Sequence, residues 1–567
     1  YRQPREWCFF PNLCSVFSVE NAVSGGECMK WIVRMVVCVV AVCLLQACSD
    51  QEEALVGETG VVATGQDSKR GGIYRIPLQN SPSTLDPAYV QDAYGVYVTQ
   101  QIFEGLVAFD RHLMVVPALA TSWRVEEQGR VYRFFLDPEA RFHDDSPVRA
   151  SDVVYSLEHL VRVSPPSVLL PHLLKVVGAE DFREGRAERI SGLTAADDTT
   201  VVVRLVEPHT PFLTALGMYQ AKIVPREVAS ALGDRFGQEP VGSGPFAFVE
   251  WTRNDLIRLR RFSGYSGTPA LLDEVHYRIY PGGEVGTILE DFQAGMLEEM
   301  PVYGSIKEKL EGMARLQLLH RPSLSLLFYG IRVDTPPLDR PELRKALSLA
   351  VDRPALVAEV YSGMFEPAAT ILPPGMPGYT PPGEPQHGRA ELARKLVTQV
   401  KEELGTLPPL EIVSATKSAF SQAELAFVRR SWEQAGVEVR ERYITDWSEF
   451  EDYLRSDAVQ IFRYVWTADM PDPDNFMTPL FASDSSINFM HFHDSGLDTA
   501  LARARSLSDP VERAQMYARI ESEVLEQHPV LPLFYLSADR AFQPWVRGAF
   551  LTPLGWQDLR LAGVWIE

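Results

Sequence analysis

The chain has 567 residues, with 54 Lys and Arg against 75 Asp and Glu, which gives a formal net charge of −21. This balance argues against a nucleic-acid partner, because binding to nucleic acid depends on neutralising phosphates with Lys and Arg. A content of 46% hydrophobic and 10% aromatic residues is typical of a globular protein, and the length suggests two or three domains.

The first predicted element is a secretion signal. Lys30 and Arg34 precede an apolar run over residues 35–45, and a small residue follows. A membrane-spanning helix needs about 20 apolar residues, and this run is too short for one. A basic start, a short apolar core and a small residue before the cut are typical of a signal peptide, which we expect over residues 29–47. Since Met29 is a natural start, we expect residues 1–28 to be non-native upstream sequence.

The signal ends in the sequence LQAC, with Cys48 as its last residue. This ending resembles a bacterial lipobox, in which the cysteine is lipidated and becomes the first residue of the mature protein. The alternative is an ordinary signal that is cleaved elsewhere. All six cysteines lie at or before Cys48, so the mature chain can form no internal disulfide and no thiolate metal cluster. Residues 48–70 lack aromatic residues and are rich in Gly and acidic residues, which predicts a flexible tether.

Beyond the tether, strands and helices alternate. The segments GGIYRIPL, VYRFFLDP and TTVVVRLVEP predict strands over residues 71–78, 131–138 and 199–208. The segment SDVVYSLEHLVR predicts a helix over residues 151–162, with Ser151 as its N-cap.

Helices are clearer in the second half. Pro341 stands at the expected first position of one helix. Another is predicted over residues 421–436, where Ser421 and Glu424 have the spacing of a capping box and Gly436 is the stop. An alternating strand, VEVRERYI, follows directly. This order predicts an α/β fold with mixed sheets flanked by helices.

No known catalytic constellation is present, so we expect a protein that is not an enzyme. The sequence has no His-Glu-x-x-His, Walker A, Gly-x-Gly-x-x-Gly or Gly-x-Ser-x-Gly motif. His491 and His493 are two apart, which fits either a metal pair or one edge of a strand. We expect no metal and no cofactor.

Six segments together resemble the family 5 extracytoplasmic solute-binding proteins, the receptors of peptide and nickel ABC importers. They are TLDPAYVQDAYGVYVTQQIFEGLVAFD, VPALATSWRV, ARFHDDSPVRASDVVYSLE, VGSGPFAFVEW, PPLDRPELRKALSLAVDR and WTADMPDPDNF. The resemblance spans about residues 70–567. It implies a two-lobed clam, the large type II periplasmic-binding-protein fold with an extra domain.

The resemblance also implies a division into three domains. Domain I would comprise residues 71–93, 200–300 and 537–567, domain II would be an insertion at 94–199, and domain III would cover 301–536. Ligand would lie between the lobes, which close around it by a hinge motion.

The resemblance places Asp469 where the family holds the α-amino group of a peptide. Asp469 follows an apolar predicted strand in a Pro-punctuated acidic loop, where a functional carboxylate is reasonable. For the neighbouring Asp472, Asp474 and Asn475 we favour a structural role, as caps of a turn or of the next helix.

Arg463 is a candidate for the ligand carboxylate, because a guanidinium can hold a carboxylate with two parallel hydrogen bonds. It shares one face of an ideal strand with Val465 and Thr467. The alternative is an arginine that is solvated or paired with a neighbouring acid. Trp466 is interpreted either as a stacking surface for ligand or as part of the core.

On the other lobe, Gln91, Asp92 and Ala93 match a family segment that contacts the peptide backbone. Gln91 departs from the oligopeptide-binding pattern, in which an acidic residue is expected, and this leaves the substrate open. Tyr94 and Tyr97 would line the cleft or belong to the core.

These features predict a monomeric binding protein in the periplasm or at the cell surface, attached to the membrane only through lipid on Cys48. It would deliver peptides to ABC permease subunits with cytoplasmic ATPases. The alternatives are a binding protein for a nickel complex, an oligosaccharide or another solute, a receptor without transport, or a lipoprotein hydrolase.

Overall fold

A computed structural model describes residues 70–567, except residues 284, 303, 314 and 382–387. The predicted signal peptide, Cys48 and the tether up to residue 69 therefore lie outside the described residues. In the part that is described, none of the helices combines the length and the apolar character needed to cross a bilayer.

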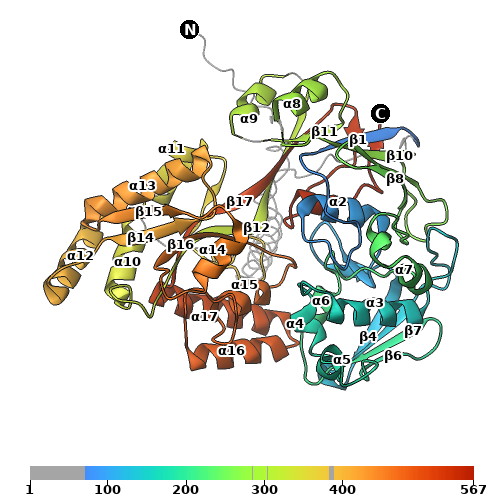
Figure 1. Cartoon of the computed structure of the whole chain (residues 1–567), viewed down its shortest axis with the longest axis horizontal. Helices are drawn as coiled ribbons and strands as arrows, with labels where there is room; N and C mark the ends of the chain where they lie inside the picture. Colours follow the sequence, from blue (N-terminus) through green and yellow to red (C-terminus); the bar gives the residue numbers. More distant parts are fainter. Residues whose placement is uncertain (1–69, 284, 303, 314, 382–387) are drawn as a thin grey trace, which may run out of the picture. The chain divides into compact units, whose positions relative to one another are not determined.

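The first sheet has the strand order β1–β10–β9–β8 (Figure 1). Its strands are β1 (Ile73–Leu78), β10 (Glu274–Ile279), β9 (Leu256–Arg261) and β8 (Phe246–Thr252). β1 pairs in parallel with β10, and the other pairs are antiparallel. Helix α2 (Ala93–Ile102) shares a buried apolar core with this sheet. The elements beside it are α7 (Arg226–Leu232), η2 (Gly233–Gly237), β18 (Val546–Arg547), η3 (Trp556–Asp558) and β19 (Trp565–Ile566).

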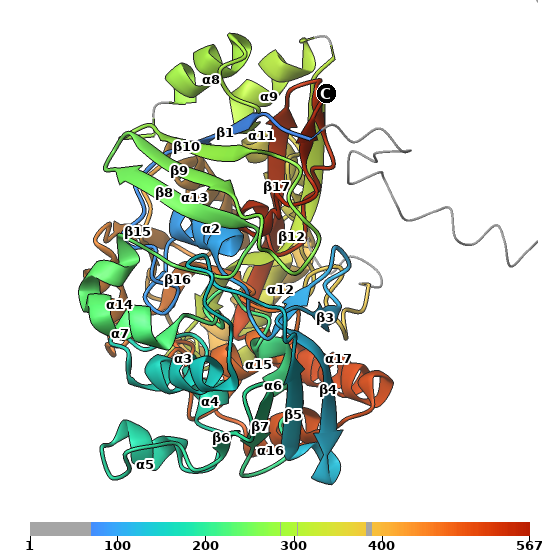
Figure 2. The same cartoon turned by 90° about the vertical axis from the view of Figure 1, so that its right-hand side faces the viewer.

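A second sheet is antiparallel, with the order β4–β5–β7–β6 (Figure 2). Its strands are β4 (Ala120–Glu126), β5 (Val131–Leu136), β7 (Thr200–Arg204) and β6 (Leu193–Ala195). The surrounding elements are β2 (Val107–Phe109), β3 (Val115–Pro117), η1 (Glu127–Gly129), α3 (Ala150–Arg162), α4 (Leu170–Leu173), α5 (Ala179–Arg183) and α6 (Pro211–Ala215).

The third sheet is mixed, with the order β11–β17–β12–β16–β14–β15, and β13 also pairs with β17. Its strands are β11 (Glu299–Pro301), β12 (Gln317–Ile331), β13 (Glu366–Pro367), β14 (Leu410–Ser414), β15 (Val439–Tyr443), β16 (Ile461–Thr467) and β17 (Val530–Phe542). Its helices are α8 (Val285–Gln293), α9 (Gly304–Glu311), α10 (Pro341–Ala350), α11 (Arg353–Tyr361), α12 (Ala390–Leu404), α13 (Ala419–Ala435), α14 (Trp447–Leu454), α15 (Asp474–Phe481), α16 (Ser495–Ser506) and α17 (Pro510–Gln527).

The long strands β12 and β17 form an antiparallel ribbon between two groups of elements (Figure 1). At one end β17 pairs with β11, and at the other end β12 pairs with β16. The pairing of β12 with β17 shifts register between Pro322 and Leu326. Such an irregularity bends and twists a strand locally, so the ribbon changes direction where it passes from one group to the other.

Most predicted elements form close to their expected ranges, but two cap predictions are wrong. Ser151 lies inside α3, which begins one residue earlier. Helix α13 begins at Ala419 with Ser418 as its N-cap, whose side chain accepts from the amide of Ser421. Glu424 is buried and bonds elsewhere, so it forms no capping box. Ser418, three residues before Ser421, can also cap a helix, and α13 extends back to it.

The division into domains stays a prediction, and the sheet pairings refine where its boundaries would fall. β7 pairs with β5 and β6, so the second sheet continues past the predicted end of domain II at residue 199. α2 packs in the core of the first sheet, although most of it falls in the predicted insertion at 94–199. We propose that domain II begins after α2 and ends after β7.

Candidate ligand-binding site

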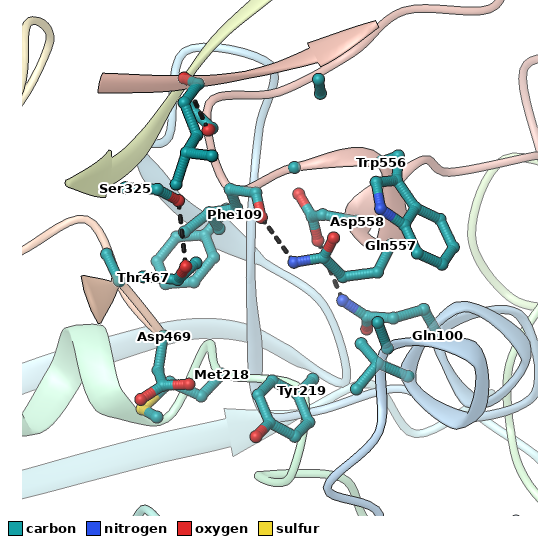
Figure 3. Close-up of a pocket in the computed structure, with 18 of the residues that line it drawn as sticks. Gln100, Phe109, Met218, Tyr219, Ser325, Thr467, Asp469, Trp556, Gln557 and Asp558 are labelled. Atoms are coloured by element: carbon teal, nitrogen blue, oxygen red, sulfur yellow. Dashed lines mark hydrogen bonds between the residues drawn. The ribbon is translucent and has the colours of Figure 1, made fainter. Parts of the chain in front are cut away.

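A cavity of about 430 Å³ lies where the start of α2 faces the C-terminal end of β16 and the middle of the β12–β17 ribbon (Figure 3). Its walls are formed by Gln91, Ala93, Val96, Gln100, Phe109, Gly217, Met218, Tyr219, Ser323, Ser325, Thr467, Ala468, Asp469, Leu536, Ser537, Ala538, Leu554, Gly555, Trp556, Gln557 and Asp558. Residues 91–109 and residues 536–558, far apart in the sequence, therefore line the same cavity. Among these described lining residues there is no Lys, Arg or His, while two are carboxylates.

Asp469 is placed by the loop that follows β16. The Ala468 amide donates to the Leu324 carbonyl of β12 at 2.8 Å, and the Asp469 amide donates to Asn475 Oδ1 at 2.9 Å. Burial raises the pKa of the Asp469 carboxyl to about 6, against the opposing effect of Asn475. With no Lys, Arg or His among the described lining residues, this buried carboxyl has no counter-charge in the wall of the cavity.

The acidic loop beyond Asp469 has the structural role that its sequence suggested. Asp472 forms a buried ion pair with Arg513, with an N–O distance of 2.7 Å, and accepts from the Asp474 amide at the start of α15. Asp474 in turn accepts from the Tyr517 hydroxyl at 2.8 Å. These contacts tie the loop to α17 and so fix the end of β16.

Asp558 is the second carboxylate of the cavity, and its oxygens already have protein partners. Gln100 Nε2 and Thr552 Oγ1 each donate to it at 2.9 Å, and Arg560 Nε lies 3.9 Å away. Gln100 Oε1 is buried without a hydrogen-bond partner among the described residues. This wall of the cavity therefore offers an amide oxygen as an acceptor, while Asp558 already accepts from two side chains of the protein.

The indole of Trp556 forms an aromatic wall that is fixed from its far side. The Arg540 guanidinium lies 4.9 Å from the ring centroid, and Tyr97 packs edge-on at 5.6 Å. Arg540 pairs with the fully buried Glu299 at 2.6 Å. Since charge pairing and packing hold Arg540 and Tyr97, Trp556 presents a preformed surface to the cavity.

Half of the predicted site residues line the cavity: Gln91, Ala93, Thr467 and Asp469. Asp92 instead caps α2, accepting from the Gly95 amide at 2.8 Å. The Tyr94 hydroxyl donates to Gln79 Oε1 at 3.2 Å. Trp466 donates from Nε1 to the Asn475 carbonyl at 2.8 Å. None of these three residues is among the lining residues of the cavity, and Asp92 and Trp466 bond to backbone groups of the segments beside it.

Arg463 also lies outside the cavity, paired with an acid. Its Nε and Nη2 donate to the two carboxylate oxygens of Glu424 at 2.9 and 3.0 Å. Glu424 is fully buried and also accepts from the hydroxyls of Tyr329 and Tyr361 at 3.0 and 2.6 Å. Nε and Nη2 of Arg463 are therefore both bonded to Glu424, and Arg463 is not part of the site that we propose.

Sequence reasoning missed most of the wall. Tyr219, Ser325 and Trp556 lie in segments with no motif that marks them, and only tertiary contacts bring them to the cavity. Burial raises the pKa of the Tyr219 hydroxyl, and the charge of Asp469 adds to that effect, so the two side chains lie within electrostatic reach.

In the described residues, no group of three or more His, Cys, Asp or Glu is arranged to hold a metal ion. The ring of His491 lies 3.1 Å from Asp334 Oδ2, and the segment that carries His491 and His493 is not a strand.

The family assignment follows from residues 114–488, which match the model of the bacterial extracellular solute-binding proteins, family 5 (middle). The chain belongs to this family. It is 28% identical over 464 residues to a dipeptide-binding protein of Escherichia coli K12, covering 78% of this chain and 84% of that protein. It is 26% identical over 494 residues to a probable deoxycholate-binding periplasmic protein of the same organism, covering 84% and 90%.

The fold is that of the two-lobed periplasmic binding proteins. A Helicobacter pylori periplasmic binding protein, solved with the peptide STSA, superimposes with a TM-score of 0.73 at 23% identity, covering 88% of this chain and 99% of that one. The predicted fold class, mixed sheets flanked by helices in a two-lobed binding protein, is confirmed.

Proposed function

We propose that this chain captures short peptides in the cavity and delivers them to the permease subunits of an ABC importer, which cytoplasmic ATPases drive. The observation that carries the proposal is Asp469, a carboxyl with a raised pKa in a cavity whose described walls contain no cation. A free peptide brings an ammonium that must be paired when it is buried. The similarity to a dipeptide-binding protein supports the same ligand class.

The walls also suit an extended peptide backbone. Gln100 Oε1 offers an acceptor, and the hydroxyls of Ser325 and Thr467, 3.0 Å apart, can each donate or accept. Trp556 and Phe109 offer apolar surface for side chains. Nothing in this arrangement aligns a nucleophile with a base, and we propose binding without catalysis.

Native mass spectrometry of protein purified without denaturation tests the ligand class. We expect bound species with peptide masses, and their loss in the Asp469→Asn variant, because the ammonium loses its partner. A bile acid, a nickel complex or an oligosaccharide in the bound fraction of the wild-type protein would contradict the peptide proposal.

We further propose that the protein is a monomer outside the cytoplasm, held at the membrane by lipid on Cys48. Replacing Cys48 with Ser should release the protein into the soluble fraction, because each acyl CH₂ that leaves the bilayer forfeits about 0.8 kcal/mol of anchoring. Membrane fractionation checks this. Cys43→Ser, within the predicted apolar core of the signal, is the matched control and should stay with the membrane. Unchanged fractionation of Cys48→Ser would rule out the anchor.

A further inference from the structure

A second cavity, of about 420 Å³, lies beside helices α3 and α7, which pack side by side (Figure 2). Its volume is within the range of small-molecule sites, roughly 300–1,000 Å³. It shares no lining residue with the cavity that contains Asp469. Its walls are formed by Thr84, Asp86, Tyr89, Tyr155, His159, Val224, Ala229, Ser230, Gly233, Asp234 and Phe236. We call it the Tyr89 cavity.

Hydrogen bonds between distant segments hold the walls of the Tyr89 cavity in place. The Leu85 amide donates to the Gly237 carbonyl at 2.8 Å, which joins the turn before α2 to the end of η2. The Arg226 amide at the start of α7 donates to Asp152 Oδ1 of α3 at 3.0 Å. Because backbone groups take part in both bonds, the walls are fixed by the fold itself and the cavity is preformed.

Aromatic rings provide much of the wall. Tyr155 and His159 lie one turn apart on α3, with their rings parallel to within 2° and the ring centroids 6.0 Å apart. Tyr89 packs edge-on against His159 at 5.7 Å and is 40% exposed, so part of its ring stays open. Phe236 and Val224 also line the cavity and are themselves buried. Open aromatic faces attract cations, and apolar walls receive alkyl groups.

The Tyr89 cavity is also acidic, and the described residues of its wall include no Lys or Arg. Burial raises the pKa of the Asp86 carboxyl, against smaller opposing effects of the Ala88 amide, which donates to it at 3.0 Å, and of His159. Burial raises the pKa of the Tyr89 hydroxyl, and the charges of Asp86 and Asp234 add to that effect. Both carboxylates therefore lie within electrostatic reach of the open ring.

We propose that the Tyr89 cavity is a separate binding site, which takes a small organic ammonium cation. The aromatic and apolar walls receive its alkyl groups, and Asp86 and Asp234 balance its charge. A metal ion fits less well, since no three His, Cys, Asp or Glu of the described residues converge to hold one. A neutral ligand would leave the carboxylates without a counter-charge. The site goes beyond peptide binding and does not depend on it.

Calorimetry with two cations and their neutral analogues tests the proposal. The pairs are choline with neohexanol and n-butylammonium with n-butanol. The titrations use the Asp469→Asn protein, so that the carboxylate of the other cavity cannot supply the counter-charge. We expect at least one cation to bind, and its neutral analogue to bind at least about 10-fold more weakly, because the charge adds cation–π attraction and pairing with two carboxylates.

Variants of the wall assign the binding to this cavity. Asp86→Asn keeps an acceptor for the Ala88 amide and should weaken binding of the cation about 5- to 10-fold, because a nearby charge is lost. Asp234→Asn, at an exposed position, gives the same test if Asp86→Asn fails to fold. Tyr89→Leu should weaken binding about 2- to 5-fold, whereas Tyr89→Phe keeps the ring and should bind normally. Glu227→Gln, an exposed acid of α7 outside the wall, is the matched control.

Equal binding of a cation and its neutral analogue would overturn the proposal, because the carboxylates would then contribute nothing. Binding that none of the wall variants changes would also overturn it, as would the absence of binding by both cations. Each of these results leaves the peptide proposal intact, since that proposal is tested with peptides and with a different carboxylate, Asp469.

Discussion

Replacing Asp469 with Asn should weaken the binding of a free-amine peptide by roughly two to three orders of magnitude. In a closed site the ammonium would be left without its counter-charge, and removing one partner of a buried ion pair costs roughly 3–5 kcal/mol. The amide keeps the shape of the side chain and one acceptor, so the loss reports the charge. Isothermal titration calorimetry measures it directly.

N-acetylation of the ligand provides the second arm of a double-mutant cycle. It should weaken wild-type binding by a similar factor and add little in Asp469→Asn, because both changes remove the same contact. Thr467→Ser, at the same wall, is a mild control that should change affinity by only a small factor. If the losses of affinity from N-acetylation and from Asp469→Asn multiply instead, Asp469 does not contact the amine.

The pKa of Asp469, about 6, gives this prediction a pH signature. The ordinary value for Asp is about 3.9, so the folded empty protein holds this proton more tightly than the unfolded chain. Its contribution to stability is therefore fully present below pH 4 and is lost as the pH rises to about 6. Asp469→Asn should lack that decline, which thermal melts at several pH values would show.

The affinity for ligand should have the opposite dependence on pH. The ammonium needs an ionised carboxylate, so affinity for a free-amine peptide should fall about tenfold between pH 7 and pH 5. The N-acetylated peptide should show no such fall, nor should Asp469→Asn. A flat profile for the wild-type protein with a free-amine peptide would contradict the pairing.

Replacing Glu424 with Gln should destabilise the protein by roughly 3–5 kcal/mol, because the charge of Arg463 would stay in a largely buried position without compensation. Glu424 has no exposed side-chain surface, and 13% of the Arg463 side chain is exposed. Urea denaturation measures the free energy of unfolding. Affinity for peptide should change little in the folded variant, since the pair lies outside the cavity.

Glu433→Gln on the same helix is the matched control. Glu433 lies 3.9 Å from Arg429 and 48% of its side chain is exposed, so its loss should change stability by no more than about 0.5 kcal/mol. If Glu424→Gln has unchanged stability but a large loss of affinity, Arg463 would have to be assigned to the ligand-binding site.

The local elements and the fold class could be predicted from the sequence. Helices α10 and α13 form where Pro341 can open a helix and Gly436 can end one, because both signals act within a turn. Asp469 was predicted from the resemblance to the family, and it lies two residues after the end of β16, in the wall of the cavity. The order of six segments along the chain identified the family.

Which charges are already paired within the protein could be learned only from the folded structure. Arg463 on β16 and Glu424 on α13 are 39 residues apart, and no local pattern links them. The sequence instead suggested that Glu424 forms a capping box with Ser421. The cavity likewise combines residues near Gln91 with residues near Asp558. Side-chain partners across such separations are set by how the sheets pack.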